Sequence, residues 1–232
     1  MEKLVSEILK DLKIDADARD FVAFSDMLLE KNKVMNLTAI TDPAEVAVRH
    51  FADCLALLNA YNFNGMRVID VGCGAGFPGL PLKLGCRDIS LTLLDSLGKR
   101  VNFLEEVCDK LALSDVECLH ARAEEQANEK GYRESFDIAV SRAVADLSML
   151  SELCLPYVKV GGVFIAMKAS DCDEELSRAE RGIKLLGGEL EKRVDYRLFG
   201  TDITRTALIF KKVTPTPAKY PRRFAKIKAS PL

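Results

Sequence analysis

The sequence predicts an α/β fold: a mostly parallel, seven-stranded sheet with helices on both faces and a helical cap in front of it. Two observations support this prediction. From Met66 onward, short runs rich in β-branched residues alternate with amphipathic helical patterns, which is typical of a doubly wound sheet. The first run leads directly into a glycine-rich turn, residues 72–76, and a helix that opens near Pro78. Alternate glycines let a bulky ligand approach the backbone N–H groups, so we expect a nucleotide-like cofactor there.

The composition bounds the class of protein. The chain has 232 residues, 48% of them hydrophobic and 29% charged, which suits one globular α/β domain with an extension. No apolar run approaches the roughly 18–20 residues that cross a bilayer, and the N-terminus lacks the core of a secretory signal. The seven cysteines contain no C-x-x-C pair and indicate reduced thiols. We therefore expect a cytoplasmic protein that binds no membrane, and we favour a monomer.

The charge is distributed unevenly along the chain. Residues 211–232 carry seven Lys/Arg and no acidic residue, whereas the rest of the chain has an excess of nine acidic groups. A basic terminus on an acidic body is typical of contact with nucleic acid, although a solvated tail has the same composition. We predict three parts: a helical extension over 1–63, a main domain over 64–213, and a basic tail over 214–232 that follows a stiff Thr214–Pro217 linker.

The extension shows three helical patterns. Residues 3–12 form an amphipathic helix, and Asp15 or Asp17 caps a second one. Residues 31–41 have turn and capping residues and predict a loop. A third helix starts at Pro43, runs to about residue 60, and presents Arg49 and His50 along one side.

The main domain alternates strands with helices. The predicted strands are residues 66–71, 89–94, 116–119, 136–141, 163–168, 189–198 and 206–213. The predicted helices are residues 78–84, 99–111, 146–159 and 172–186, and residues 120–125 form a loop. Ligands of such sheets bind beyond the carboxyl ends of the strands, so the loops after the first four strands are the candidate site.

The glycine spacing distinguishes two kinds of cofactor. A dinucleotide fold needs G-x-G-x-x-G, but the third glycine position is occupied by Phe77, which counts against NAD or FAD. The pattern that is present, D-x-G-x-G-x-G from Asp70, favours S-adenosylmethionine. A second acid, Asp95, ends the second strand, where it would accept the ribose hydroxyls or cap the following helix.

Five blocks in a fixed order resemble one family. VIDVGCGAGFPGLPL resembles the cofactor loop of class I S-adenosylmethionine-dependent methyltransferases, which have a Rossmann-like fold. MNLTAI, VRHFADCLALL, LTLLDSLGKRVNFLEEV and FDIAVSRAVADL match further blocks over about residues 34–232. Together they resemble the RsmG (GidB) family, bacterial enzymes that methylate N7 of a guanine in 16S ribosomal RNA. The resemblance implies the small ribosomal subunit or its RNA as partner.

The resemblance also implies roles for single residues. Asp95 would hold the ribose, and Arg142 would contact the cofactor or the incoming base. The remaining implied cofactor residues lie in the loops after the first and third strands: Gly72, Gly74, Gly76 and Phe77, and Ala123 and Glu124, which would border the adenine.

Three departures from the family pattern stand out. Cys54 replaces a serine, and Ala169 replaces the glycine expected after Lys168. The last residues, YPRRFAKIKASPL, lack the family's usual Gly-x-Pro. The last two departures concern regions expected to contact RNA.

Methyl transfer to N7 needs no general base, because N7 presents a free lone pair at neutral pH. Ser141-Arg142-Ala143 follows the fourth strand, where enzymes that methylate exocyclic amines resemble N/D-P-P-Y/F. We therefore expect Arg142 to act by positioning the methionine carboxylate, the guanine O6 or a phosphate. The alternative is an ion pair with Asp146 or Glu124.

The expected RNA contacts are polar and basic residues outside the cofactor loop. His50 would face the substrate or serve a structural role, and Asn36 would touch a base or cap a turn. Phe77 would neighbour the unstacked guanine or pack on the sheet. The full set expected to contact RNA is Asn36, Arg49, His50, Lys168, Arg222, Arg223, Lys226 and Lys228.

Two other functions remain open at this point: a small-molecule methyltransferase, and a non-catalytic rRNA-binding assembly factor. The basic tail argues against the first, and the intact glycine loop with Asp95 argues against the second. We expect no metal site, because the two histidines, His50 and His120, lack the spacing of metal ligands.

Overall fold

The computed structural model describes residues 1–142 and 145–232, so Ala143 of the Ser141-Arg142-Ala143 stretch lies outside the described residues. Its centre is a seven-stranded sheet in the order β3-β2-β1-β4-β5-β7-β6. β7 runs antiparallel to both β5 and β6, and the other neighbouring pairs are parallel. The strands are β1 Arg67–Val71, β2 Ser90–Asp95, β3 Val116–His120, β4 Phe136–Arg142, β5 Val158–Ala169, β6 Gly188–Arg197 and β7 Thr204–Lys212. The predicted α/β class and the mostly parallel sheet are confirmed.

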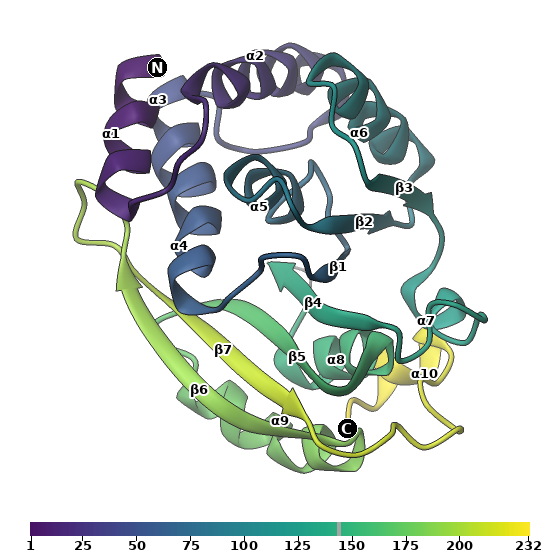
Figure 1. Cartoon of the computed structure of the whole chain (residues 1–232). Coiled ribbons are helices and arrows are strands. Elements are labelled where there is room, and N and C mark those ends of the chain that lie inside the picture. Colours follow the sequence, from purple (N-terminus) through teal and green to yellow (C-terminus); the bar gives the residue numbers. More distant parts are fainter. Residues whose placement is uncertain (143–144) are drawn as a thin grey trace.

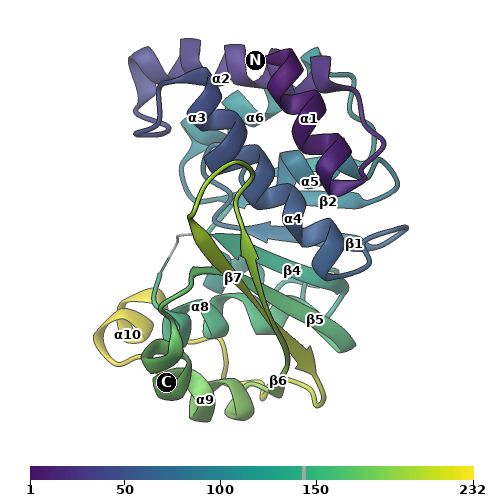
Figure 2. The same ribbon diagram turned by 90° about the vertical axis from the view of Figure 1, so that its left-hand side faces the viewer.

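The helices form two layers around this sheet (Figures 1 and 2). Side chains alternate along each strand, so that Val68 and Leu93 join the core under α1–α6, while Ile69 and Leu94 join the core under α8–α10. The helices of the first layer are α1 Glu2–Leu12, α2 Ala18–Met35, α3 Pro43–Val46, η1 Ala47–Ala52, α4 Asp53–Ala60, α5 Gly79–Gly85 and α6 Gly98–Lys110. The others are α7 Ala123–Gln126, α8 Leu147–Cys154, η2 Leu155–Tyr157, α9 Asp173–Leu185 and α10 Phe224–Ala229.

The N-terminal helices follow the sequence pattern with one correction. Asp17, rather than Asp15, caps α2: its carboxylate accepts from the backbone N–H of Arg19 at 2.9 Å. The expected loop over residues 31–41 is wrong in its first part, because α2 continues to Met35 and ends at Asn36 in the left-handed region. α3, η1 and α4 form one continuous run in which η1 is a π-helical turn, a form often found at functional sites.

The boundary between α8 and β5 also differs from the prediction. The expected helix over 146–159 ends at Cys154, a single 3₁₀ turn containing Pro156 follows, and β5 begins at Val158. Gly162 lies inside this strand instead of in a turn. A Cβ at this position would lie 2.5 Å from the carbonyl oxygen of Asp137, so only glycine fits beside β4.

The C-terminal residues are a packed part of the fold instead of a linker and a solvated tail. Tyr220 and Ile227 are buried against α8 and its neighbours, and residues 224–229 form α10. α10 lies beside α7 and α8 in Figure 1. None of the helices in the described ranges combines the length and the apolar character needed to cross a membrane.

Candidate active site

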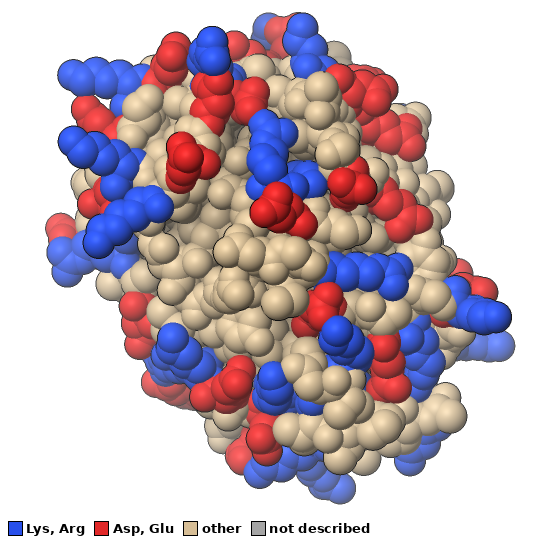
Figure 3. Space-filling model, in the orientation of Figure 1, with Lys and Arg blue, Asp and Glu red and all other residues tan. Residues whose placement is uncertain are grey.

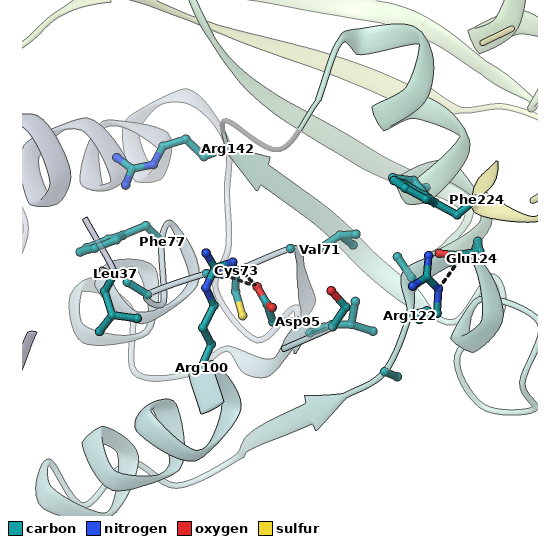
Figure 4. Close-up of a pocket in the computed structure, with 18 of the residues that line it drawn as sticks. Leu37, Val71, Cys73, Phe77, Asp95, Arg100, Arg122, Glu124, Arg142 and Phe224 are labelled. Atoms are coloured by element: carbon teal, nitrogen blue, oxygen red, sulfur yellow. Dashed lines mark hydrogen bonds and ion pairs between the residues drawn. The ribbon is translucent and has the colours of Figure 1, made fainter. Parts of the chain in front are cut away.

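A cavity of about 520 Å³ opens where the strand order reverses. β1 pairs with β2 on one side and β4 on the other, and all three strands end at the same edge. The cavity is lined by the loops that follow β1, β2 and β3, by Arg142 at the end of β4, and by residues from both ends of the chain (Figure 4). This is the position at which doubly wound sheets bind their ligands.

The glycine loop forms the floor of the cavity. The N–H groups of Gly72 and Cys73 donate to the carbonyl of Leu94, at 2.8 and 3.1 Å, which holds the loop against β2. Gly76 has a φ of 98°, and a Cβ there would lie 2.5 Å from Leu80 Cδ1. Gly74 lines the cavity with a φ of 59°, and a Cβ there would meet no protein atom within 4 Å. A side chain at Gly74 would therefore fill space that a ligand can occupy.

Asp95 connects this loop to the next helix. One carboxylate oxygen accepts from the Gly74 N–H and the other from the Leu97 N–H, both at 2.9 Å. Arg100 lies 3.5 Å from the same carboxylate. The N-cap residue of α6 is Leu97 and no side chain caps this helix, so the suggestion that Asp95 is its cap is wrong. Asp95 instead holds the two loops together and lines the cavity.

Asp70 lies beneath the loop and is fully buried. Its Oδ2 accepts from the Gly79 N–H at 2.7 Å, whereas its Oδ1 has no partner among the described residues. Burial raises the pKa of Asp70 to about 7, and the Gly79 N–H and the Arg142 charge oppose this shift.

One end of the cavity is built around Arg142. Its Nη1 donates to Asp53 Oδ2 at 3.1 Å and to the carbonyl of Arg49 at 3.3 Å. The second Asp53 oxygen accepts from the Tyr196 hydroxyl at 2.8 Å. The Arg142 side chain is only 14% exposed, and Asp53 is buried, so the pair lies in a region of low dielectric. The suggested ion pair with Asp146 or Glu124 is wrong: the partner is Asp53.

His50 completes this end. His50 Nδ1 lies 3.1 Å from Arg142 Nη2 and 3.2 Å from the carbonyl oxygen of Arg49. His50 Nε2 lies 3.0 Å from the Thr38 hydroxyl. Burial and the nearby Arg142 lower the pKa of His50 to about 3. The ring is therefore neutral at physiological pH and is held by three partners.

Phe77 packs against aromatic side chains of the N-terminal helices. Its ring centroid lies 4.4 Å from that of His50 and 5.4 Å from that of Phe24. The guanidinium of Arg142 stands 4.9 Å from the Phe77 ring centroid, within cation–π range. The aromatic residue that excludes a dinucleotide motif thus joins the extension to the cavity.

The opposite end of the cavity lies at α7 and α10. Ala123 and Glu124 line it, and the Tyr157 hydroxyl donates to the Ala123 carbonyl at 2.7 Å, which fixes α7. Arg122 donates to Glu124 Oε1 at 2.7 Å and lies 5.3 Å from the ring centroid of Phe224. In Figure 4, Arg122, Glu124 and Phe224 lie on the opposite side of the cavity from Phe77 and Arg142.

Eight residues are expected to contact RNA; His50 is half-buried in the Arg142 cluster, and the other seven divide into two groups. Lys168 donates to Glu175 at 2.6 Å, and Arg222 binds Glu152 through its Nε and Nη2. Both pairs are largely buried, so the prediction that these two side chains face RNA is corrected: their charges are used inside the fold. The exposed members of the set are Asn36, Arg49, Arg223, Lys226 and Lys228.

Arg49 is partly neutralised, because its Nε lies 2.8 Å from Glu45. On the face shown in Figure 3, acidic and basic side chains are interspersed around a central uncharged area.

Three residues of the site were not predicted: Asp53, Arg122 and Phe224. Asp53 follows the predicted His50 by three positions on the same helical run, and Arg122 lies directly before the predicted Ala123. For both, closeness in sequence to a predicted residue was an available signal. Phe224 had no such signal, because nothing local in the tail indicates that it folds back onto the β3 loop. In the part of the chain that the structure describes, no three His, Cys, Asp or Glu side chains cluster as metal ligands.

Comparison with known proteins agrees with this geometry. The family model for GidB, described as rRNA small subunit methyltransferase G, matches residues 17–197. The chain belongs to this family. It is 49% identical over 213 residues to the ribosomal RNA small subunit methyltransferase G of Lachnoclostridium phytofermentans, covering 91% of this chain and 88% of that protein. The Clostridium perfringens protein of the same name is 47% identical over 91% of this chain and 89% of its own length.

The GidB chain also shares its fold with more distant proteins. TrmN from Thermus thermophilus superposes with a TM-score of 0.54 at 20% identity, over 72% of this chain and 53% of that one. M. jannaschii TYW2, solved in complex with AdoMet, gives 0.52 at 14% identity, over 66% and 73%. The fold is that of the class I S-adenosylmethionine-dependent methyltransferases.

Proposed function

We propose that this protein transfers a methyl group from S-adenosylmethionine to N7 of a guanine in 16S ribosomal RNA. The names of its relatives, rRNA small subunit methyltransferases, support the RNA substrate. The single observation that carries the proposal is a cavity whose two ends differ in composition. The glycine loop and Asp95 form the floor, which extends to Ala123 and Glu124 at one end, and the cluster of Arg142, His50 and Asp53 lies at the other end.

S-adenosylmethionine would fit against the glycine loop that forms the cavity floor and against α7 at one end of the cavity. The cavity volume of about 520 Å³ lies within the range of small-molecule sites, roughly 300–1,000 Å³. Gly72 and Gly74 leave the floor free of side chains and Gly76 permits the turn, while Asp95 would hold the ribose hydroxyls. Ala123 and Glu124 would border the adenine. The bound sulfonium supplies an activated methyl group, and the residues of this chain orient it.

The Arg142 end suits an acceptor that needs no deprotonation. A general base must offer a free acceptor to the proton it removes. His50 offers no such acceptor, because Nδ1 contacts Arg142 and the Arg49 carbonyl and Nε2 contacts the Thr38 hydroxyl. The Asp53 carboxylate is likewise occupied by Arg142 and Tyr196. N7 already carries a lone pair, so positioning by Arg142, with Phe77 beside it, supplies the rate enhancement.

The exposed polar and basic residues provide the RNA surface. Asn36 and Arg49 lie beside the Arg142 end, and Arg223, Lys226 and Lys228 lie on or next to α10. Contacts of lysine and arginine with phosphates give affinity that falls as salt rises. A ribosomal RNA substrate supports a cytoplasmic location, and a monomer remains the favoured state.

The test is transfer of labelled methyl from S-adenosylmethionine to small ribosomal subunits from a strain that lacks the modification. We expect the label in 7-methylguanosine after digestion of the RNA. Arg178→Ala, an exposed residue of α9 outside the cavity, is the matched control and should retain wild-type transfer. Cofactor binding without transfer to any RNA would instead support the small-molecule enzyme or the assembly factor.

A further inference from the structure

The C-terminal segment, residues 216–232, forms part of the cavity wall. Phe224, the first residue of α10, lines the cavity together with Arg122, Glu124 and Leu153. Figure 4 shows the Phe224 ring beside Arg122 and Glu124, at the end opposite Arg142. A residue that follows β7 by twelve positions thus lies against the loop after β3.

The residues around Phe224 are tightly anchored. The Arg222 N–H donates to Glu152 at 2.8 Å, and its guanidinium binds both oxygens of this buried carboxylate. Arg133 donates to the carbonyls of Thr216 and Tyr220, each at 2.9 Å. Ile227, on the same short helix, is fully buried. The ring therefore has a fixed place before any ligand arrives, which lowers the entropy cost of binding.

Phe224 and Arg122 also separate two cavities. A second cavity of about 350 Å³ lies on their far side and is lined by Asn128, Pro221 and Arg223 as well. Arg122 is anchored to Glu124, and its guanidinium lies 5.3 Å from the Phe224 ring centroid. The two side chains line both cavities and so stand between them.

We propose that Phe224 packs against the adenine ring of the bound cofactor, so that the C-terminal segment is a component of the cofactor site. This inference rests on the proposed function, which places the adenine beside Ala123 and Glu124. A planar adenine that enters this end meets an aromatic ring held in position by Arg122, and offset stacking of two π-systems is favourable there. Phe224 lies within the stretch where this sequence departs from the family's Gly-x-Pro.

Cofactor binding measured by calorimetry tests the inference, with S-adenosylhomocysteine as the probe. Phe224→Ala should weaken binding about five- to tenfold, because the aromatic contact is lost. Phe224→Tyr should bind within about twofold of wild type, since it keeps the ring. Lys219→Ala, an exposed residue of the same C-terminal segment, is the matched control and should bind as wild type does.

A second measurement does not depend on any variant. Hydrogen exchange of the wild-type protein should slow over residues 223–229 when S-adenosylhomocysteine is added, because the ligand packs on Phe224. If Phe224→Ala does not fold, this measurement decides the inference. Wild-type protein that binds the probe without slower exchange there, or a folded Phe224→Ala that binds equally well, overturns the inference alone. Wild-type protein that does not bind the probe overturns the proposed function as well.

Discussion

The two ends of the cavity are built in different ways. At the Arg142 end, a buried arginine is held by a carboxylate, a histidine and an aromatic ring that come from or pack on the N-terminal helices. At the Phe224 end, a half-exposed Arg122 and an aromatic ring from the C-terminal segment form the wall. A buried charge is therefore fixed where the acceptor guanine would react, and an aromatic ring lies where the adenine of the cofactor would bind. Changes at the first end should affect the rate, and changes at the second should affect cofactor affinity.

Removal of Arg142 should give the largest effect. Arg142→Ala should lower kcat for methyl transfer by about 10²–10³-fold, the usual cost of losing a preorganised electrostatic contact. Affinity for S-adenosylhomocysteine should change much less. The check is single-turnover transfer to small-subunit RNA alongside calorimetry, with Arg178→Ala as control. If Arg142→Ala lost affinity for S-adenosylhomocysteine but kept its rate of methyl transfer, the Arg142 end would be the one that binds the cofactor.

Asp70, beneath the floor between the two ends, should make stability depend on pH. Its pKa is about 7 in the fold against 3.8 when unfolded, so between these values the folded state holds a proton that the unfolded state has lost. Stability from this group is complete below pH 3.8 and is lost as pH rises to about 7, at about 1 kcal/mol per pH unit.

Asp70→Asn should remove this dependence, so its stability relative to wild type should increase from pH 4 to pH 7 and stay level above. Urea unfolding of the cofactor-free protein across that range measures the difference. A constant difference at every pH would show that Asp70 titrates normally.

Asp53 should affect the rate of methyl transfer indirectly, by holding the Arg142 guanidinium in place. Asp53→Asn keeps an acceptor but removes the charge that fixes the guanidinium, and we expect kcat to fall about tenfold as positioning loosens. Tyr196→Phe removes only the hydroxyl donor to Asp53, so its effect should be smaller in the same direction. Both variants should bind S-adenosylhomocysteine normally. Equal rates for Asp53→Asn and wild type would mean that Arg142 does not depend on this pair.

Replacement of His50 should have the smallest effect, and it should not change the pH dependence of the methyl-transfer rate. The pKa of His50 is about 3, so it stays neutral from pH 5.5 to pH 8 and should contribute no inflection to the single-turnover rate. The profiles of His50→Gln and wild type should have the same shape. An inflection near pH 6.5 that is present in wild type and absent in His50→Gln would show that the imidazole titrates in the reaction.

The sequence predicted those features of the fold that depend on residues close together in the chain. The glycine loop was recognisable because its backbone shape requires glycine at fixed positions, such as Gly76. The strands before Asp95 and Arg142 follow from alternating local patterns, and these two residues lie at strand ends as expected. The extra turn of α2 and the early end of α8 were not predicted, because packing against distant elements decides such boundaries.

The sequence by itself therefore determined the α/β class, the sheet and the position of the cofactor loop, since each depends on hydrophobic period and turn chemistry over short distances. Only the tertiary structure decided the partners of the charged side chains. Arg142 binds Asp53, 89 residues away, and Arg222 binds Glu152, 70 residues away. An unpaired charge in the protein interior is costly, so each buried charge must have a partner. The pairing of Arg222 with Glu152 holds the basic C-terminal segment against the fold, where it lines the cavity.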